Sequence, residues 1–237
     1  MATDRDHGGS GSRSRSGGPK SIQRQAQVDQ LVGFEHGPDA TQRATEEALA
    51  RSDNARSIVL VEGISDQIAV ETLAERMGRR LAEEPVVVMP IGGAHAAKHF
   101  VPRFANPRGV KLSGLVDRAE EVHFRRALAE VGLVASTAGP AALESQGFFV
   151  CDADLEEELI RSLDQKAIES VLGSEGDLDA FRSLQNQPVW RNRPFEEQMH
   201  RWLRSVALRG SRYARLLVLE AEAPRIPRPL TNLVNRI

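Results

Sequence analysis

The chain has 237 residues, enough for one domain with a hydrophobic core, with or without an appendage. Its formal net charge of -2 gives no global basic character, so contact with nucleic acid would require local patches or a tail. The single cysteine, Cys151, excludes an intramolecular disulfide and a cysteine-rich zinc site. No apolar stretch approaches the roughly 18 residues of a transmembrane helix, and the polar N-terminus lacks the apolar core of a secretory signal. We therefore expect a soluble, cytoplasmic protein with no membrane partner.

The N-terminal residues 1–26 are rich in glycine, serine and arginine. They have almost no apolar surface to bury, so this segment is predicted to be a disordered arm. Its bases outnumber its acids, which is compatible with weak contact with nucleic acid, although the composition favours a solubilising tail. A helix is predicted over residues 41–52.

Strand and helix patterns alternate from residue 57 onward. Predicted strands cover residues 57–61, 86–91, 111–116 and 147–151. Helices are predicted over about residues 65–81, 94–104 and 119–131, and through 157–160. Strands that are apolar throughout and alternate with helices predict an α/β fold, in which a Rossmann-like parallel four-stranded sheet carries helices on both faces.

Strand patterns stop after about residue 165. Residues 180–211 predict helices broken near Pro188 and Pro194, and a proline-rich stretch over 224–229 precedes a final helix over 230–237. We predict three parts: the arm over 1–26, a core domain with its preceding helix over 27–165, and a helical extension over 166–237 that packs on the sheet.

Acidic residues recur where the predicted strands end. They are Glu62 after the first strand, Asp117 after the third, and Asp152, Asp154 and Glu156 after the fourth. Asp66 lies four residues after Glu62, in the first turn of the next helix. Because the carboxyl ends of parallel strands share one edge, these acids are expected to converge. The alternative for any one of them is a helix cap.

Converging carboxylates repel one another unless they are protonated or share a cation. Oxygen ligands without a cysteine or histidine favour Mg²⁺ or Mn²⁺ over Zn²⁺. A divalent ion held this way suits chemistry on phosphates. The Gly92-Gly93 turn before a helix could bring backbone N–H groups to a phosphate of a bound cofactor or substrate, or could simply be a tight turn.

Four features together resemble a TOPRIM domain: Glu62-Gly63-Ile64-Ser65-Asp66, the Gly92-Gly93 turn, Asp117 at a strand end, and Asp154-Leu155-Glu156. The sequence is most similar to the TOPRIM domain of the overcoming-lysogenization-defect (OLD) family of ATP-dependent endonucleases. The resemblance covers about residues 57–163, and Arg209-Gly210 extends it more weakly towards the C-terminus.

The resemblance implies a Mg²⁺- or Mn²⁺-dependent endonuclease or nucleotidyl transferase, acting on DNA or RNA in DNA repair or phage defence. Glu62 would be a metal ligand or general base. Asp66, Asp117, Asp154 and Glu156 would complete the metal positions. Arg209 would replace a catalytic lysine; it keeps a positive charge for phosphate but cannot donate a proton.

The sequence departs from the family pattern in two ways. Ala119 replaces the second acid of the Asp-x-Asp motif, for which Glu120 or Glu121 could substitute. No Gly-x-x-x-x-Gly-Lys-Ser/Thr motif is present, so we expect a stand-alone TOPRIM domain with an ATPase or helicase partner in trans. A non-catalytic module that binds a nucleotide or nucleic acid is therefore the alternative to a nuclease.

Two further patterns have ordinary structural interpretations. His95 and His99 are four residues apart on a predicted helix, but no third metal ligand is evident between or beside them. A basic stretch surrounds two aromatic residues, Trp202 and Tyr213; its members are Arg201, Arg204, Arg209, Arg212 and Arg215. It predicts either contact with a nucleic-acid backbone or a solvated helix face.

Overall fold

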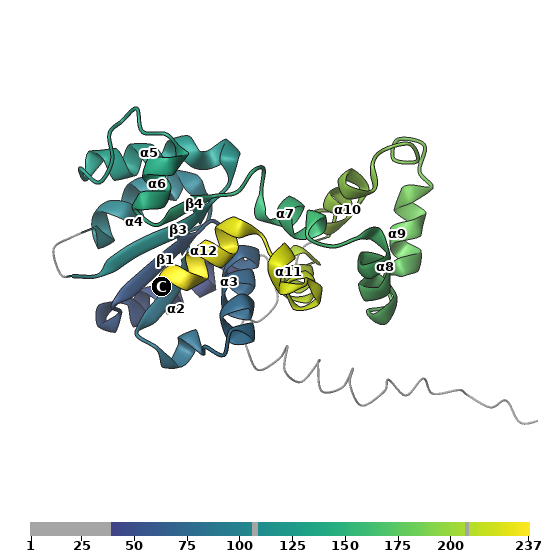
Figure 1. The fold of residues 1–237 in the computed structure, drawn as a ribbon, viewed down its shortest axis with the longest axis horizontal. Helices are drawn as coiled ribbons and strands as arrows, with labels where there is room; N and C mark the ends of the chain where they lie inside the picture. The colour runs from purple at the N-terminus through teal and green to yellow at the C-terminus, as the bar shows by residue number, and fades with distance from the viewer. Residues whose placement is uncertain (1–38, 106–108, 207–208) are drawn as a thin grey trace, which may run out of the picture. The chain divides into compact units, whose positions relative to one another are not determined.

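The computed structural model describes residues 39–105, 109–206 and 209–237 (Figure 1). The predicted arm over 1–26 lies outside these residues. Within them, no helix is both long enough and apolar enough to cross a bilayer.

Four parallel strands form one sheet in the order β2-β1-β3-β4. The strands are β1 (Ser57–Val61), β2 (Val86–Pro90), β3 (Lys111–Val116) and β4 (Phe148–Val150). This confirms the predicted parallel four-stranded sheet, and the bounds of β1 and β3 are those predicted. Strands β2 and β4 are shorter than predicted by one and two residues.

Both faces of the sheet are buried, as continuous apolar strands require. In β1, Ile58 and Leu60 belong to one core cluster, Val59 and Val61 to the other, and all four are fully buried. The first cluster is closed by α2 (Ala40–Arg51), α4 (Ala97–Phe104), α5 (Glu121–Glu130) and α6 (Pro140–Ser145). The second is closed by α3 (Ile64–Arg76), α11 (Arg209–Glu220) and α12 (Arg228–Arg236).

Four helices lie between the sheet and α11 in the sequence: α7 (Leu155–Arg161), α8 (Gln165–Ser174), α9 (Leu178–Gln185) and α10 (Phe195–Leu203) (Figure 1). Aromatic rings join α9, α10 and α11, because Phe181 contacts Phe195 and Trp202 edge-on, and Trp202 contacts Tyr213 of α11 in the same way. Helix α9 ends before Pro188 and α10 begins after Pro194, so the two prolines separate these helices as predicted.

The C-terminal helices return to the sheet. The Arg76 guanidinium at the end of α3 donates to the backbone carbonyls of Val218 and Ala221, next to α11. Leu230, Leu233 and Val234 of α12 are fully buried in the core cluster that includes β3 and β4. Helix α11 thereby places its first residues near the carboxyl edge of the sheet, where the predicted acids lie.

Candidate active site at the carboxyl edge of the sheet

Glu62 directly follows β1 and is fixed by two neighbouring loops. Its backbone carbonyl accepts hydrogen bonds from the amides of Gly92 and Gly93, at 3.1 and 3.0 Å. These glycines have φ values of 75° and 106°, which side chains other than glycine rarely adopt. The Glu62 side chain accepts a 3.2 Å hydrogen bond from the amide of Asp117. The two glycine amides thus already have an acceptor, and the turn positions Glu62; their phosphate-binding role stays a prediction.

Asp66 and Glu156 approach Glu62 from two different helices. Asp66, in the first turn of α3, is 9% exposed and accepts a 2.9 Å hydrogen bond from the amide of Gly63. Glu156, in the first turn of α7, accepts a 3.1 Å hydrogen bond from the Ser65 hydroxyl. A methyl group added at Gly210 would lie 3.8 Å from Glu156 Oε1, so the start of α11 also borders the site.

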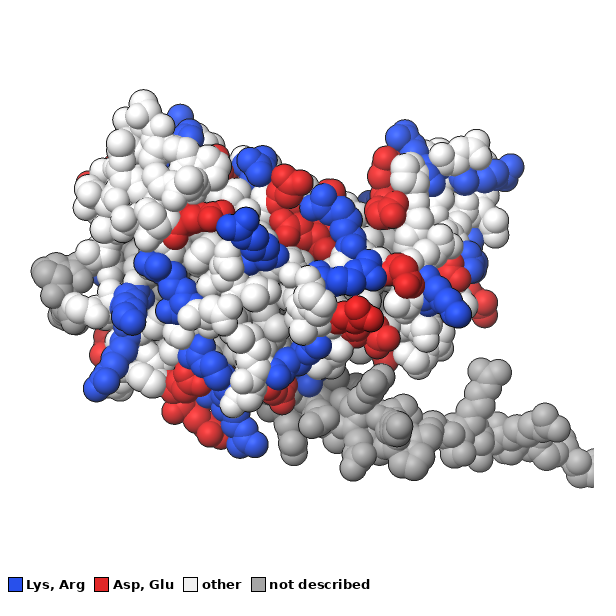
Figure 2. All heavy atoms as spheres, in the orientation of Figure 1, with Lys and Arg blue, Asp and Glu red and all other residues white. Residues whose placement is uncertain are grey.

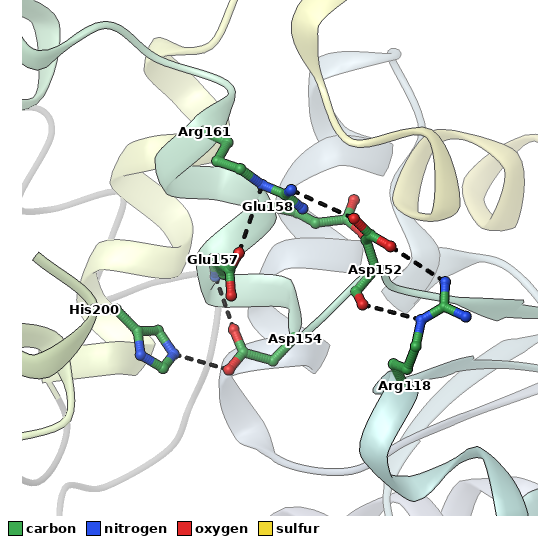
Figure 3. A network of polar contacts seen from close by, with 7 residues as sticks. All are labelled: Arg118, Asp152, Asp154, Glu157, Glu158, Arg161 and His200. Atoms are coloured by element: carbon green, nitrogen blue, oxygen red, sulfur yellow. Dashed lines mark hydrogen bonds and ion pairs between the residues drawn. The ribbon is translucent and has the colours of Figure 1, made fainter. Parts of the chain in front are cut away.

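Asp154 caps helix α7 (Figure 3), and its charge also acts on Glu62 and Asp117. Its Oδ1 accepts a 2.8 Å hydrogen bond from the amide of Glu157, as an N-cap carboxylate should. Its Oδ2 lies 2.8 Å from His200 Nε2 and 3.6 Å from the Arg204 guanidinium, both on or at the end of α10. His200 and Arg204 are four residues apart, so they share one helix face. The strand-end pattern gave no signal for His200; only that helical spacing could have singled it out.

The electrostatics show that the acids share one environment. The pKa of Asp117 is raised to about 8, first by burial and then by the charges of Glu62, Asp154 and Glu156, against a hydrogen bond from the Leu155 amide. Burial likewise raises the pKa of Glu62 to about 7, with Glu120 the strongest of the neighbouring charges.

The two remaining cluster acids with shifted pKa values move in opposite directions. The pKa of Asp66 is raised well above its ordinary value, chiefly by burial and then by Glu156 and Asp117. For Asp154, burial acts against ionisation, but the hydrogen bonds from His200 and Glu157 outweigh it and the pKa is lowered. Asp154 is therefore stabilised in its ionised form, whereas Glu62, Asp66 and Asp117 are destabilised in theirs by burial and by one another.

The cluster fits a hard divalent cation by its donor chemistry. It consists of five carboxylates: Glu62, Asp66, Asp117, Asp154 and Glu156. Carboxylate oxygens are the ligands of Mg²⁺, and a shared cation relieves their repulsion. Within the described ranges, no three of these carboxylates offer oxygens that all lie within 4.8 Å of one another.

Two residues that the sequence patterns singled out, Asp152 and Arg209, make their contacts outside the acidic cluster. Asp152 is exposed and pairs with Arg118 and Arg161, at 3.2 and 3.5 Å (Figure 3). The Arg209 guanidinium lies 3.9 Å from the centre of the Trp202 ring and donates to the Trp202 carbonyl at 2.8 Å. The side chain of Arg209 thus follows α10, although its neighbour Gly210 borders Glu156.

The basic stretch divides into separate environments. Trp202 and Tyr213 are buried, and Arg215 is 7% exposed and pairs with Glu75. In contrast, a surface pocket of about 340 Å³ is lined by Trp190, Glu197, His200, Arg201 and Arg204. This pocket adjoins Asp154 through His200. Elsewhere on the face drawn in Figure 2, basic and acidic side chains are interspersed.

The cluster makes the stability of the metal-free protein depend on pH. Glu62 and Asp117 keep their protons to about pH 7 and 8 in the folded state, whereas unfolded carboxyls release theirs near pH 4. The folded state binds more protons in this window, so the free energy of unfolding falls as pH rises. The pKa of His200 is raised by Asp154, so its stabilisation is also lost as pH rises. The lowered pKa of Asp154 matters only below this window.

We expect the melting temperature in EDTA to be several degrees lower at pH 8.5 than at pH 6, and Mg²⁺ to restore more of it at pH 8.5. Thermal denaturation followed by circular dichroism measures both. Asp117→Asn should flatten the pH dependence in EDTA, while Asp152→Asn, an exposed acid outside the cluster, should leave it unchanged. Equal melting temperatures at the two pH values in EDTA would show that the acids do not interact as described.

Comparisons with known proteins support the same region. Residues 55–118 match the family described as the overcoming lysogenization defect protein-like TOPRIM domain. The structure is similar to the C-terminal region of the Burkholderia pseudomallei OLD protein, with a TM-score of 0.57 and 20% identity over 77% of this chain and 96% of that one. It is also similar to the C-terminal region of the Xanthomonas campestris pv. campestris OLD protein, with a TM-score of 0.61 and 20% identity over 79% and 94%. No curated protein matches.

Proposed function

We propose that this chain, which carries an OLD-like TOPRIM domain over residues 55–118, is a Mg²⁺-dependent nuclease that cleaves nucleic-acid phosphodiesters. The observation that carries the proposal is the convergence of Glu62, Asp117 and Asp154, from three strand ends, with Asp66 and Glu156. Such a set of oxygen ligands at the carboxyl edge of a parallel sheet suits a cation that binds phosphate.

Glu120 supports a catalytic site despite the alanine in the Asp-x-Asp motif. It lies one residue beyond Ala119, at the end of a short 3₁₀ turn (Arg118–Glu120), and its charge is the strongest of those that raise the pKa of Glu62. An acid is thus present close to the position where the motif lacks one. This favours the nuclease over the alternative, a non-catalytic module that binds nucleic acid with an ATPase partner.

The chemistry assigned to each group follows from its environment. Bound Mg²⁺ would neutralise the carboxylates and polarise phosphate oxygens. Glu62, which directly follows β1 and accepts a hydrogen bond from the Asp117 amide, would accept the proton of an attacking water. Asp66 and Asp117 would be metal ligands, as would Asp154, whose charge His200 and Arg204 partly balance.

The pocket beside the acids provides the nucleic-acid contact in this proposal. Arg201 and Arg204 offer two positive charges for phosphates, and Trp190 offers an aromatic ring for a base. His200 joins the pocket to Asp154. A nucleic-acid strand bound in this pocket would place a phosphodiester next to the carboxylates. DNA and RNA share these features, so the arrangement suits either.

Magnesium binding distinguishes the proposal from its alternative. In calorimetry at pH 8, the wild type should bind Mg²⁺ at millimolar concentration, and Asp117→Asn should weaken binding at least about tenfold because a ligand is lost. Asp152→Asn is the matched control, since the same change two residues from Asp154 removes only exposed ion pairs. No heat of binding for the wild type at millimolar Mg²⁺ would contradict the nuclease and favour the non-catalytic module.

A further inference from the structure

A second group of metal-binding side chains lies beside the acidic cluster. It consists of His95, Glu120 and His123, whose ligand atoms all lie within 4.8 Å of one another. The two imidazole rings have centroids 4.0 Å apart and are tilted by 57°. His123 Nε2 lies 3.5 Å from Glu120 Oε2. No other group of this kind is found in the part of the chain that the structure describes.

Two separate segments of backbone bring these side chains together. Glu120 and His123 are three residues apart across the start of α5, so they share a helix face. The Glu-x-x-His spacing is one that metal sites in helical proteins use. His95 comes from a short 3₁₀ turn (Ala94–Ala96) that directly follows the Gly92-Gly93 turn. The fold places His123, and not His99, beside His95.

The donor set selects a different ion from that of the carboxylates. Two imidazoles and one carboxylate suit Zn²⁺ and related transition metals and leave a fourth position open, whereas Mg²⁺ prefers oxygen ligands alone. Ligand atoms around one tetrahedral Zn²⁺ are about 3.3 Å apart, given bonds of about 2.0–2.1 Å. His95 is exposed and the other two side chains are half-buried, so rotation of side chains can close the present spacing.

We propose that His95, Glu120 and His123 form a binding site for a transition-metal ion of the Zn²⁺ class, which borders the five carboxylates assigned to Mg²⁺ and shares none of them. The same contacts would also arise from a Glu120–His123 ion pair with His95 packed against it, so binding has to be measured. Because Glu120 belongs to this site, metal binding here would also affect the acidic cluster. A cation on Glu120 would neutralise the charge that acts on Glu62.

The test uses the full chain, stripped with EDTA and dialysed, with 10 mM Mg²⁺ present to occupy the carboxylates. Zn²⁺ titration by calorimetry should show one site of micromolar or tighter affinity. Co²⁺ should bind competitively with Zn²⁺ and give visible absorption bands typical of nitrogen-containing coordination. His95→Ala and His123→Ala should each weaken Zn²⁺ binding at least tenfold and remove the bands.

His99→Ala is the matched control, because His99 is exposed, lies four residues from His95 and is outside the group; it should leave Zn²⁺ binding unchanged. His95 is exposed, so its substitution should leave the circular dichroism spectrum intact. Zn²⁺ affinity that is unchanged by both histidine substitutions would overturn the site. So would complete displacement of Zn²⁺ by the added Mg²⁺. Glu62→Gln should retain the Zn²⁺ site, so this outcome is independent of whether the protein cleaves nucleic acid.

Discussion

Glu62→Gln is expected to abolish the Mg²⁺-dependent cleavage of plasmid DNA, with a loss of at least about 100-fold in rate. Positioned general bases typically contribute about 10²–10⁴-fold, and the amide can neither accept a proton nor carry the charge that a metal ligand needs. The hydrogen bond from the Asp117 amide can still be made to the amide oxygen, so the local structure should survive. The effect is measured as the initial rate of plasmid nicking at pH 8 with about 5–10 mM Mg²⁺.

Glu71→Gln is the matched control for this substitution. Glu71 also has a pKa raised to about 7 by burial, but its neighbours are Gln67 and Arg51 and not the acidic cluster. The Glu71→Gln variant should therefore cleave plasmid DNA at the wild-type rate. Cleavage that persists in the Glu62→Gln variant, and in the wild type after addition of EDTA, would rule out the mechanism. Absence of cleavage in the wild type at this Mg²⁺ concentration would contradict the nuclease and favour the non-catalytic module.

Trp202→Ala is expected to lower the free energy of unfolding by about 3–5 kcal/mol, the usual range for a large aromatic residue removed from a core. Trp202 is 2% exposed, contacts Phe181 and Tyr213 edge-on, and carries the Arg209 guanidinium over its ring. Its loss would leave a cavity between α9, α10 and α11. Because His200 lies on the same helix, we also expect α10 to hold Asp154 less firmly. Chemical denaturation in urea measures the stability.

The second tryptophan gives the contrasting control. Trp190 is half-buried and lines the pocket with Arg201 and Arg204, so Trp190→Ala should change stability much less than Trp202→Ala. It should instead weaken binding of single-stranded oligonucleotides by about 1–3 kcal/mol, roughly 5- to 150-fold, because stacking on a base is lost. Fluorescence anisotropy in EDTA separates binding from cleavage. Unchanged oligonucleotide affinity would remove the pocket from the proposed interface.

The sequence alone was sufficient to predict the parallel sheet and the edge of the sheet on which the acids lie. Strands buried on both faces must be apolar throughout, and this local pattern located β1 and β3 to the residue. The rule that ligands gather at the carboxyl ends of parallel strands then selected Glu62 and Asp117 without any knowledge of contacts. Periodicity did not predict α6, which at six residues is too short to show a clear helical repeat, nor α8, which has ten.

Only the tertiary structure decided which side chains meet. Asp152 and Asp154 are two residues apart, yet one pairs with surface arginines and the other faces the cluster. His200 reaches Asp154 across 46 positions, and His95 meets His123 across 28, and no local period encodes such contacts. The pKa values depend on the same contacts. Burial and neighbouring charges raise the pKa of Asp117, whereas the hydrogen bonds from His200 and Glu157 lower that of Asp154. Strand patterns are local and can be read from the chain; the separation of the acidic cluster from the histidine site depends on packing between distant segments.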